Sequence, residues 1–324
     1  MSVAQTISPA DRDLMKRLAI VFAFLFVLTA GFSHLVRTYS QKFYDVTGEA
    51  RWIWAQHPMN TSEPVAFFAA RDFDLPEQRI FTQIKVLGDP EYTLYVNGQK
   101  IAGQLVGEDR KIHLFDISDL VKTGRNRVVI GVRAAQGFGG LIAAIDIAPE
   151  TRNWVVTDSS WRIYRRWDPA LLAKDLATDW ESPLIIGEPP VGRWNFLDIE
   201  NAQRSAPSVE VQQPVESFEV DGFIPRVKTR NGMAFATADP AKAMAFDFGV
   251  TRGRLRLTLN RDRAFSRAVM VRYANARQEL PLVEWALRPV VFAPGERVVE
   301  IPETNDNFRY VMVFAEDVRV EVVR

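Results

Sequence analysis

Residues 18–36, LAIVFAFLFVLTAGFSHLV, form an almost unbroken apolar run that only Thr29, Ser33 and His34 interrupt. As a helix rising about 1.5 Å per residue, this run would be about 28 Å long, close to the thickness of the hydrocarbon core of a bilayer. A short polar tail, residues 1–17, precedes the run, and the remainder of the chain is typical of a water-soluble protein. We therefore expect a transmembrane helix at 18–36 that holds a large soluble body at the lipid bilayer.

Two alternatives remain for the apolar run. A cleaved signal peptide would have a shorter apolar stretch followed by a cleavage site of small residues. Thr29-Ala30-Gly31 is a weak candidate for such a site, because the apolar run continues beyond it and the tail before the run is long for a signal peptide. A helix buried inside a soluble domain is the second alternative. The features together favour an uncleaved anchor.

The orientation of this anchor is judged from the basic residues beside it. Both flanks are basic, with Arg12, Lys16 and Arg17 before the run and Arg37, Lys42 and Arg51 after it. Positive-inside counting therefore gives no preference. The pair Lys16-Arg17, directly beside the run on a short tail, favours a cytoplasmic amino terminus. The predicted localisation is a single-pass membrane protein whose bulk is extracytoplasmic, either periplasmic or at the cell surface.

Composition excludes several kinds of site and partner. The chain has 324 residues with 40 basic and 40 acidic side chains, so no global charge favours nucleic acid as a partner. It has no cysteine, which excludes disulfides, thiolate metal sites and a cysteine nucleophile. With only three histidines, a multi-histidine metal site is not expected either. We predict no metal and no cofactor.

The residues after position 50 predict short strands separated by turns. The clearest element is EYTLYVNGQKIAG, in which Tyr92, Leu94 and Val96 share one strand face. Asn97-Gly98 supplies the two positive-φ residues of a type I′ hairpin. Many strands at such spacing, without alternating long helices, indicate a β-sandwich.

Several of these segments carry a resemblance to a known family. In order along the chain they are ARWIW, RDFDL, EYTLYVNGQKIAG, HLFDISDLVKTGRNRVVIGV and VVTDSSWR. In this order they resemble the amino-terminal, galactose-binding-like β-sandwich of bacterial α-L-rhamnosidases, over about residues 50–161. AFDFGVTRGRLRLTL and AVMVRYA resemble a further sandwich of the same enzymes. The resemblance implies jelly-roll domains of the carbohydrate-binding type.

The catalytic part of that family has no counterpart in this sequence. The resemblance implies that the catalytic acids lie on an α/α-barrel, and residues 37–324 contain no run of amphipathic helices that would build one. Other carboxylate pairs, Asp89 with Glu91 and Glu108 with Asp109, lie in turn-like segments, where acids are usually solvated. We therefore predict no catalytic residues and no enzymatic activity, with a glycoside hydrolase remnant as the alternative.

The remaining segments complete a mainly β organisation. Asp168-Pro169 predicts a helix start, and ALLAKDLATDW a helix of about three turns, followed by an extended arm over the sandwich. RGRLRLTLN alternates strictly, which places Leu255, Leu257 and Leu259 inward. The predicted parts are a cytoplasmic tail (1–17), the transmembrane helix (18–36), a stalk (37–49), a first β-sandwich with helical insert and arm (50–204), a linker (205–217) and a second β-sandwich (218–324).

Aromatic side chains give the candidate binding residues, because sugar-binding sandwiches cover the apolar faces of pyranose rings with Trp and Tyr. Trp52, Trp54 and Trp161 are expected in the core. Trp180 and Trp194 lie in the irregular arm together with Arg193, and we expect them to form an exposed platform. Tyr95 and Asn97 lie at the hairpin tip and complete the set of candidate carbohydrate-binding residues.

Two functions of different classes fit this sequence. The first is a membrane-anchored, non-catalytic protein whose sandwiches bind an extracytoplasmic glycan or polysaccharide, within an assembly or export system. The second is a structural or interaction subunit of a membrane complex that uses the sandwiches as docking surfaces for protein partners. An exposed aromatic cleft would favour the first, and a large apolar patch or a free edge strand the second.

Overall fold

The computed structural model describes residues 9–324 except 60, 78–80, 107–109, 149–150, 177–179, 196–197, 206–209, 231–232, 262, 282–286, 303–305 and 316. The chain divides into two compact units, Met1–Gly48 and Glu49–Arg324. Each unit is described by itself.

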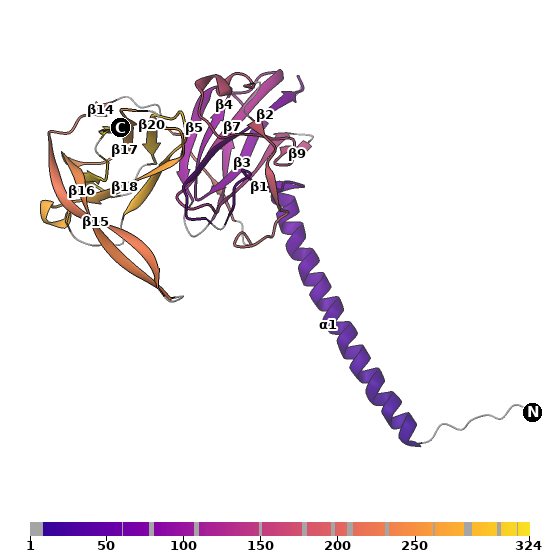
Figure 1. Cartoon of the computed structure of the whole chain (residues 1–324). Coiled ribbons are helices and arrows are strands. Elements are labelled where there is room, and N and C mark those ends of the chain that lie inside the picture. Colours follow the sequence, from indigo (N-terminus) through magenta and orange to yellow (C-terminus); the bar gives the residue numbers. More distant parts are fainter. Residues whose placement is uncertain are drawn as a thin grey trace, which may run out of the picture. The chain divides into compact units, whose positions relative to one another are not determined.

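The first unit contains one long helix, α1 (Pro9–Thr47) (Figure 1). Its segment Met15–Thr38 has a mean hydropathy of 2.2 and no buried residues, so by length and composition it can cross a membrane. The hydroxyls of Thr29 and Thr38 donate to the carbonyls of Leu25 and His34, which satisfies these polar groups inside the helix. The helix ends at Thr47, so the segment predicted as a stalk is mostly a continuation of the same helix.

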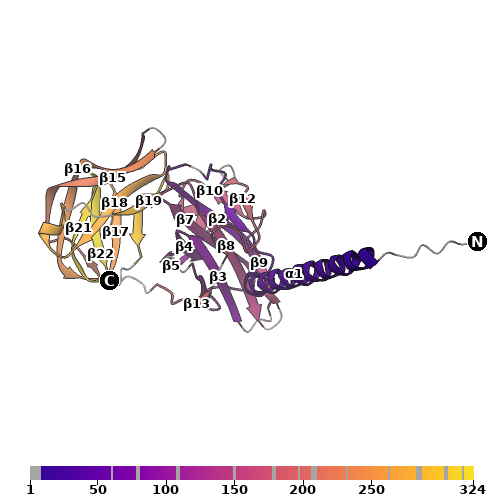
Figure 2. The ribbon, with the colours of Figure 1, turned by 90° about the horizontal axis from the view of Figure 1, so that it is seen from below.

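The second unit begins with two facing β-sheets, which we call the first sandwich. Sheet A consists, in spatial order, of β12 (Leu184–Gly187), β1 (Trp52–Trp54), β8 (Gly140–Ala148), β3 (Phe81–Asp89), β6 (Ile112–Asp116) and β13 (Ile199–Asn201), with β9 (Thr151–Val156) also paired to β8. Sheet B consists of β11 (Trp180–Glu181), β10 (Arg162–Tyr164), β2 (Val65–Leu75), β7 (Gly124–Ala134), β4 (Glu91–Val96) and β5 (Gln99–Leu105). Figure 2 shows β3 and β8 of sheet A beside β2 and β7 of sheet B. In a β-sandwich, one face of each sheet is buried against the other sheet.

The core between sheets A and B follows the alternation expected from the sequence. Tyr92, Leu94 and Val96 are fully buried in it, and so is the side chain of Trp54. Trp52 and Trp161 are also buried, as predicted. At the end of β4, Asn97 and Gly98 have φ values of 46° and 84°, which confirms the predicted positive-φ hairpin.

The helix predicted after Asp168 is much shorter than expected. Asp168 caps it as predicted, because its carboxylate accepts a hydrogen bond from the Ala170 amide. The element is only one 3-10 turn, η1 (Pro169–Leu172), and residues 177–179 lie outside the described part. Leu171 is buried on the face of sheet B that points away from the main core, beside Phe68 and Val129. Packing along a flat sheet face thus overrides the helical propensity of this segment.

The arm that follows is incorporated into the sheets. Its β12 pairs with β1 at one edge of sheet A, and its β13 pairs in parallel with β6 at the opposite edge. The arm is therefore extended, as expected, but it contributes both edge strands of sheet A.

Two further sheets form the second sandwich. Sheet C consists of β14 (Val211–Gln212), β22 (Val318–Val323), β17 (Arg254–Leu259) and β20 (Val298–Ile301), and sheet D of β15 (Glu216–Arg230), β16 (Met233–Thr251), β21 (Phe308–Val313), β18 (Arg267–Ala274) and β19 (Arg288–Phe292). Leu255, Leu257 and Leu259 are buried in the core, which confirms the alternation of β17. β14 and the first residues of β15 fall inside the segment predicted as a linker.

One hairpin of sheet D is longer than its neighbours. β15 and β16 pair with each other as far as Arg230 and Met233, whereas β16 pairs with β21 only between Met244 and Thr251. The two strands therefore continue beyond the sheet as a two-stranded ribbon, visible in orange in Figure 1.

Candidate functional site

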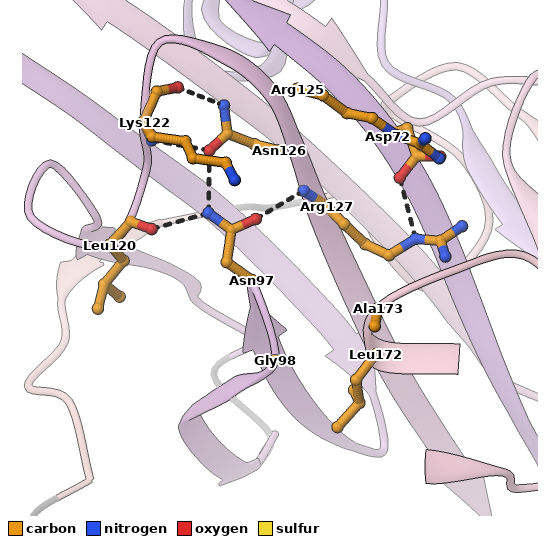
Figure 3. Close-up of a pocket in the computed structure, with 10 residues that line it drawn as sticks. All are labelled: Asp72, Asn97, Gly98, Leu120, Lys122, Arg125, Asn126, Arg127, Leu172 and Ala173. Atoms are coloured by element: carbon orange, nitrogen blue, oxygen red, sulfur yellow. Dashed lines mark hydrogen bonds and ion pairs between the residues drawn. The ribbon is translucent and has the colours of Figure 1, made fainter. Parts of the chain in front are cut away.

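A pocket of about 520 Å³ opens on the first sandwich, where the exposed end of sheet B meets the turn after β6 and the end of η1 (Figure 3). Its volume lies in the range of small-molecule sites. The residues that line it are Asp72, Asn97, Gly98, Leu120, Lys122, Arg125, Asn126, Arg127, Leu172 and Ala173. Leu172 and Ala173 form an apolar side, and most of the others present polar groups.

A row of alternating charges runs across sheet B beside this pocket. We call it the ion ladder: Arg125, Asp72, Arg127, Asp175 and Arg162. Asp72 binds Arg125 Nη2 at 2.7 Å and Arg127 Nε at 3.0 Å. Asp175 binds both Arg127 and Arg162. Because each carboxylate holds two guanidinium groups, the ladder fixes its side chains before any ligand arrives.

Two asparagines hold the wall of the pocket opposite the ladder. Asn97 donates to the Leu120 carbonyl (2.8 Å) and to Asn126 Oδ1 (2.9 Å), and accepts from the Arg127 amide (2.9 Å). Asn126 is buried, accepts from the Lys122 amide (2.8 Å) and donates to the carbonyls of Lys122 and Gly124. Both amide groups are thus occupied, so their role in the described structure is to fix the hairpin tip and the turn that carries Lys122.

An exposed indole lies at the other end of the ion ladder. Trp180 on β11 is 44% exposed, and the Arg162 guanidinium lies 5.1 Å from its ring centroid. Such a geometry is a cation–π contact, which holds the ring in place. Tyr164, the strand neighbour of Trp180, donates its hydroxyl to Asp175 at 3.1 Å, and burial raises its pKa, so the hydroxyl keeps its proton.

The five predicted binding residues divide between two places. Asn97 lines the pocket, Trp180 lies at the end of the ion ladder, and Tyr95 belongs to the same sheet B. Tyr95 is half-buried with its ring centroid 5.8 Å from that of Trp167, and burial raises its pKa to about 12. Arg193 and Trp194 lie apart from the pocket, against strands of sheet A.

Trp194 does not form the exposed platform that we expected. It is 1% exposed, it stacks on Trp52 with 4.3 Å between ring centroids, and its Nε1 donates to Asp89 Oδ2 at 2.7 Å. The ring lies directly on Gly140, where a Cβ atom would come within 2.6 Å of it. The absence of a side chain at this glycine makes room for the indole, which pins the arm against sheet A.

Arg193 covers the same cluster from outside. Its guanidinium binds Asp89 (2.8 Å) and lies 4.3 Å from the ring centroid of Phe138, which is itself stacked on Trp194. Gly137-Phe138-Gly139-Gly140, the loop between β7 and β8, is therefore closely packed.

The carboxylates that we expected in solvated turns are buried. Asp89 is bound to Arg193 and Trp194, while Glu91 lies 3.7 Å from Arg288. Burial raises the pKa of Glu91, and the charges of Arg133 and Arg288 oppose that effect. Glu108 and Asp109 lie outside the described residues.

Sequence reasoning missed most of the pocket. The ion ladder joins residues from β2, β7, β10 and the segment after η1, and only the strand register brings them together. One signal was available: GRNRVVIGV begins with Arg125 and Arg127 at alternate positions, and VAFFAARDFDL ends with Asp72 and Asp74 at alternate positions, while the rest of each strand is mostly apolar. Asp72 and Arg127 are direct cross-strand partners.

Two other pockets, of about 580 and 570 Å³, lie between the sandwiches. One is lined by residues such as His57, Arg165 and Phe265, and the other by several arginines, among them Arg204 and Arg324. Neither contains a residue that the sequence predicted for binding.

Comparisons with known proteins show a likeness in fold. No protein-family model matches the sequence, and no curated protein matches it either. The solved structure of α-L-rhamnosidase from Dictyoglumus thermophilum is similar, with a TM-score of 0.50 and 18% identity over 85% of this chain and 35% of that chain. An α-L-rhamnosidase from Aspergillus terreus also matches, with a TM-score of 0.47 and 14% identity over 85% of this chain and 36% of that chain. A lectin from Pleurotus ostreatus in complex with GalNAc matches with a TM-score of 0.40 and 16% identity over 86% of this chain and 75% of that chain.

At these identities the likeness concerns the fold alone. The chain spans about a third of the length of the two rhamnosidases. The expected resemblance to part of such an enzyme is therefore found in the structure, while no sequence-level match to a family supports it.

Proposed function

We propose that this protein is a membrane-anchored, non-catalytic glycan-binding protein whose pocket on sheet B receives a sugar. The observation that carries the proposal is the pocket itself, in which a preformed ion ladder runs from the cavity to the exposed ring of Trp180. Sugars offer hydroxyl groups around a partly apolar ring. A site for them combines fixed polar side chains with an aromatic or aliphatic surface.

The fold supports the same proposal. The rhamnosidase of Dictyoglumus thermophilum is an enzyme named for its action on a sugar, and this chain corresponds to about a third of it. The regular structure in the described part of the second unit consists of strands and two 3-10 turns, and the described carboxylate pair, Asp89 and Glu91, is held in ion pairs. We therefore assign the chain recognition of a glycan and no hydrolytic chemistry.

The membrane role rests on α1. We propose that residues 18–36 cross the bilayer as an uncleaved anchor with residues 1–17 in the cytoplasm. The pocket would then lie on the extracytoplasmic side, periplasmic or at the cell surface, where a polysaccharide under assembly or export is the expected ligand. The exposed, apolar segment Met15–Thr38 supports this arrangement.

Glycan binding is tested with the full-length protein in detergent micelles on an array of bacterial and plant polysaccharides. We expect binding to at least one class, weakened about fivefold to tenfold by Trp180→Ala, as loss of one aromatic contact implies. Phe138→Ala is the matched control, because Phe138 is a half-exposed ring in the separate Trp194 cluster. No binding to any polysaccharide would contradict the proposal, and loss with Phe138→Ala alone would move the site to that cluster.

The alternative, a docking subunit of a membrane complex, is favoured by one observation. β15 is a 15-residue edge strand of sheet D, and such edges can add a strand from a partner. Affinity capture of the full-length protein from its native membrane, followed by mass spectrometry, tests this function. A stoichiometric protein partner that is lost when β15 carries a proline at Val220 would support it, and recovery of the chain alone would contradict it.

A further inference from the structure

We propose that the sugar bound in the pocket on sheet B is acidic, and that its carboxylate, sulfate or phosphate group is bound by Lys122, in the positive field of Arg125 and Arg127. This inference rests on the proposed function and specifies the chemical class of its ligand. Two observations carry it: an ammonium group without a partner on the pocket wall, and an excess of positive charge around the cavity.

The guanidinium of Arg127 is buried and only partly used. Its side chain is 6% exposed; Nε faces Asp72 and Nη2 binds Asp175. Nη1 is buried and has no hydrogen-bond partner among the described residues. Because Nη1 is closed off from the pocket, Arg127 acts on a bound oxyanion through its charge and not through a direct hydrogen bond.

Lys122 supplies the second cation. Asn126 fixes its backbone: the Lys122 amide donates to Asn126 Oδ1 at 2.8 Å, and Asn126 Nδ2 donates to the Lys122 carbonyl at 2.7 Å. Among the described residues its ammonium group makes no hydrogen bond or ion pair. Figure 3 shows the side chain extended beside the amides of Asn97 and Asn126, on the pocket wall. A fixed backbone with a free ammonium group is suited to a ligand of opposite charge.

The balance of charge points the same way. Four cations, Arg125, Arg127, Arg162 and Lys122, stand around two carboxylates, Asp72 and Asp175. Asp74 is near enough for its charge to act on Arg125, and cations remain in excess when it is counted. The whole chain, by contrast, has equal numbers of acidic and basic residues. The positive charge is therefore a local property of this pocket.

An oxyanion on a sugar fits this arrangement better than a long polyanion. The pocket holds about 520 Å³, and its polar wall is occupied by internal hydrogen bonds, which leaves the Lys122 ammonium free for a charged group. Arginine and lysine both bind carboxylate, sulfate and phosphate oxygens through charge-assisted hydrogen bonds. These three groups share the chemistry that the pocket recognises.

The test compares acidic oligosaccharides with neutral counterparts of the same sequence. Uronic-acid oligosaccharides and their carboxyl-reduced forms, and sulfated or phosphorylated oligosaccharides and their unsubstituted forms, are titrated into the full-length protein in detergent micelles. We expect at least one acidic member to bind about tenfold more tightly than its neutral partner, with an advantage that shrinks as salt rises. Which pair shows it identifies the oxyanion.

Variants distinguish this inference from the proposed function. Lys122→Gln is expected to weaken binding of the acidic member about fivefold to tenfold and to leave the neutral member unchanged. Lys174→Gln is the matched control, because Lys174 is an exposed lysine near the pocket that does not line it. Equal binding of acidic and neutral members, or no effect of Lys122→Gln, would overturn the acidic-ligand inference and leave glycan binding standing. Failure of every oligosaccharide would overturn both.

Discussion

Arg133 on β7 of the first sandwich and Glu296 in the turn after β19 of the second form a buried ion pair, with 2.5 Å between Nη2 and Oε1. Both side chains are almost completely buried. Arg133 also donates to Thr93 Oγ1 at 3.0 Å, and Glu296 accepts from the Ala293 amide at 3.0 Å. The two sandwiches therefore meet through a buried ion pair that forms only when both are folded together.

Removing one member of this pair is expected to destabilise the protein strongly. Glu296→Gln leaves the Arg133 guanidinium buried with much of its charge uncompensated, which typically lowers the free energy of unfolding by about 3 kcal/mol. The double variant Arg133→Met/Glu296→Leu should recover most of that loss, because no buried charge is left without its partner. Urea denaturation followed by tryptophan fluorescence measures both. A loss below about 1 kcal/mol in the single variant would contradict the prediction.

Glu300 on β20 makes stability depend on acid pH. Burial alone would raise its pKa, but Lys100 (2.7 Å) and Arg256 (2.7 Å) outweigh that effect and lower the pKa to about 2. A carboxyl group whose pKa is lowered on folding stabilises the protein above its unfolded pKa, and that stabilisation is lost as the pH falls. We expect this loss between about pH 4.5 and pH 2, amounting to about 3 kcal/mol at most. Glu300→Gln should be less stable at pH 7 and show a shallower decline over that interval, measured by thermal unfolding at each pH.

Gly140 is expected to tolerate no side chain. A Cβ atom there would lie 2.6 Å from the Trp194 ring and 2.8 Å from the Trp52 ring, and both rings are held by surrounding structure. Gly140→Ala should therefore lower the free energy of unfolding by about 2 kcal/mol or more, as overpacking of cores does. Gly103→Ala is the control, because its nearest neighbour would lie 3.9 Å away. Equal melting temperatures of the two variants would contradict this prediction, because they would mean that the stacked rings of Trp52 and Trp194 move to make room for the added methyl group.

Asn126 is expected to hold the turn that carries Lys122. Asn126→Ala removes its hydrogen bonds to Lys122, Gly124 and Asn97 from a buried position, which should destabilise the protein by about 2–3 kcal/mol. Amide hydrogen exchange should rise first at residues 120–124, before global unfolding. Uniform exchange over the whole first sandwich would instead mean that the turn has no local stability of its own.

Local patterns predicted the parts of the fold that depend on neighbours in sequence. The alternation of Leu255, Leu257 and Leu259 and the turn at Asn97-Gly98 are of this kind, because strand period and positive φ are decided within a few residues. Such patterns could not predict that Trp194 is buried, since its partner Trp52 lies far away in the sequence.

The candidate site was less predictable than the fold for the same reason. Asp72 and Arg127 meet because β2 and β7 pair in one particular register, and Asp175 reaches Arg127 because η1 ends after a single turn. A longer helix, as its composition favoured, would have carried Asp175 along a different path. The ion ladder is thus a product of tertiary packing.

Both borders of sheet A are strands of the arm, since β12 and β13 come from one segment only 18 residues long. A sheet border left without a partner pairs readily with strands of other molecules. Proteolytic loss of this one segment would therefore leave β1 and β6 without partners at the same time, and would open both edges of the sheet to pairing with other chains.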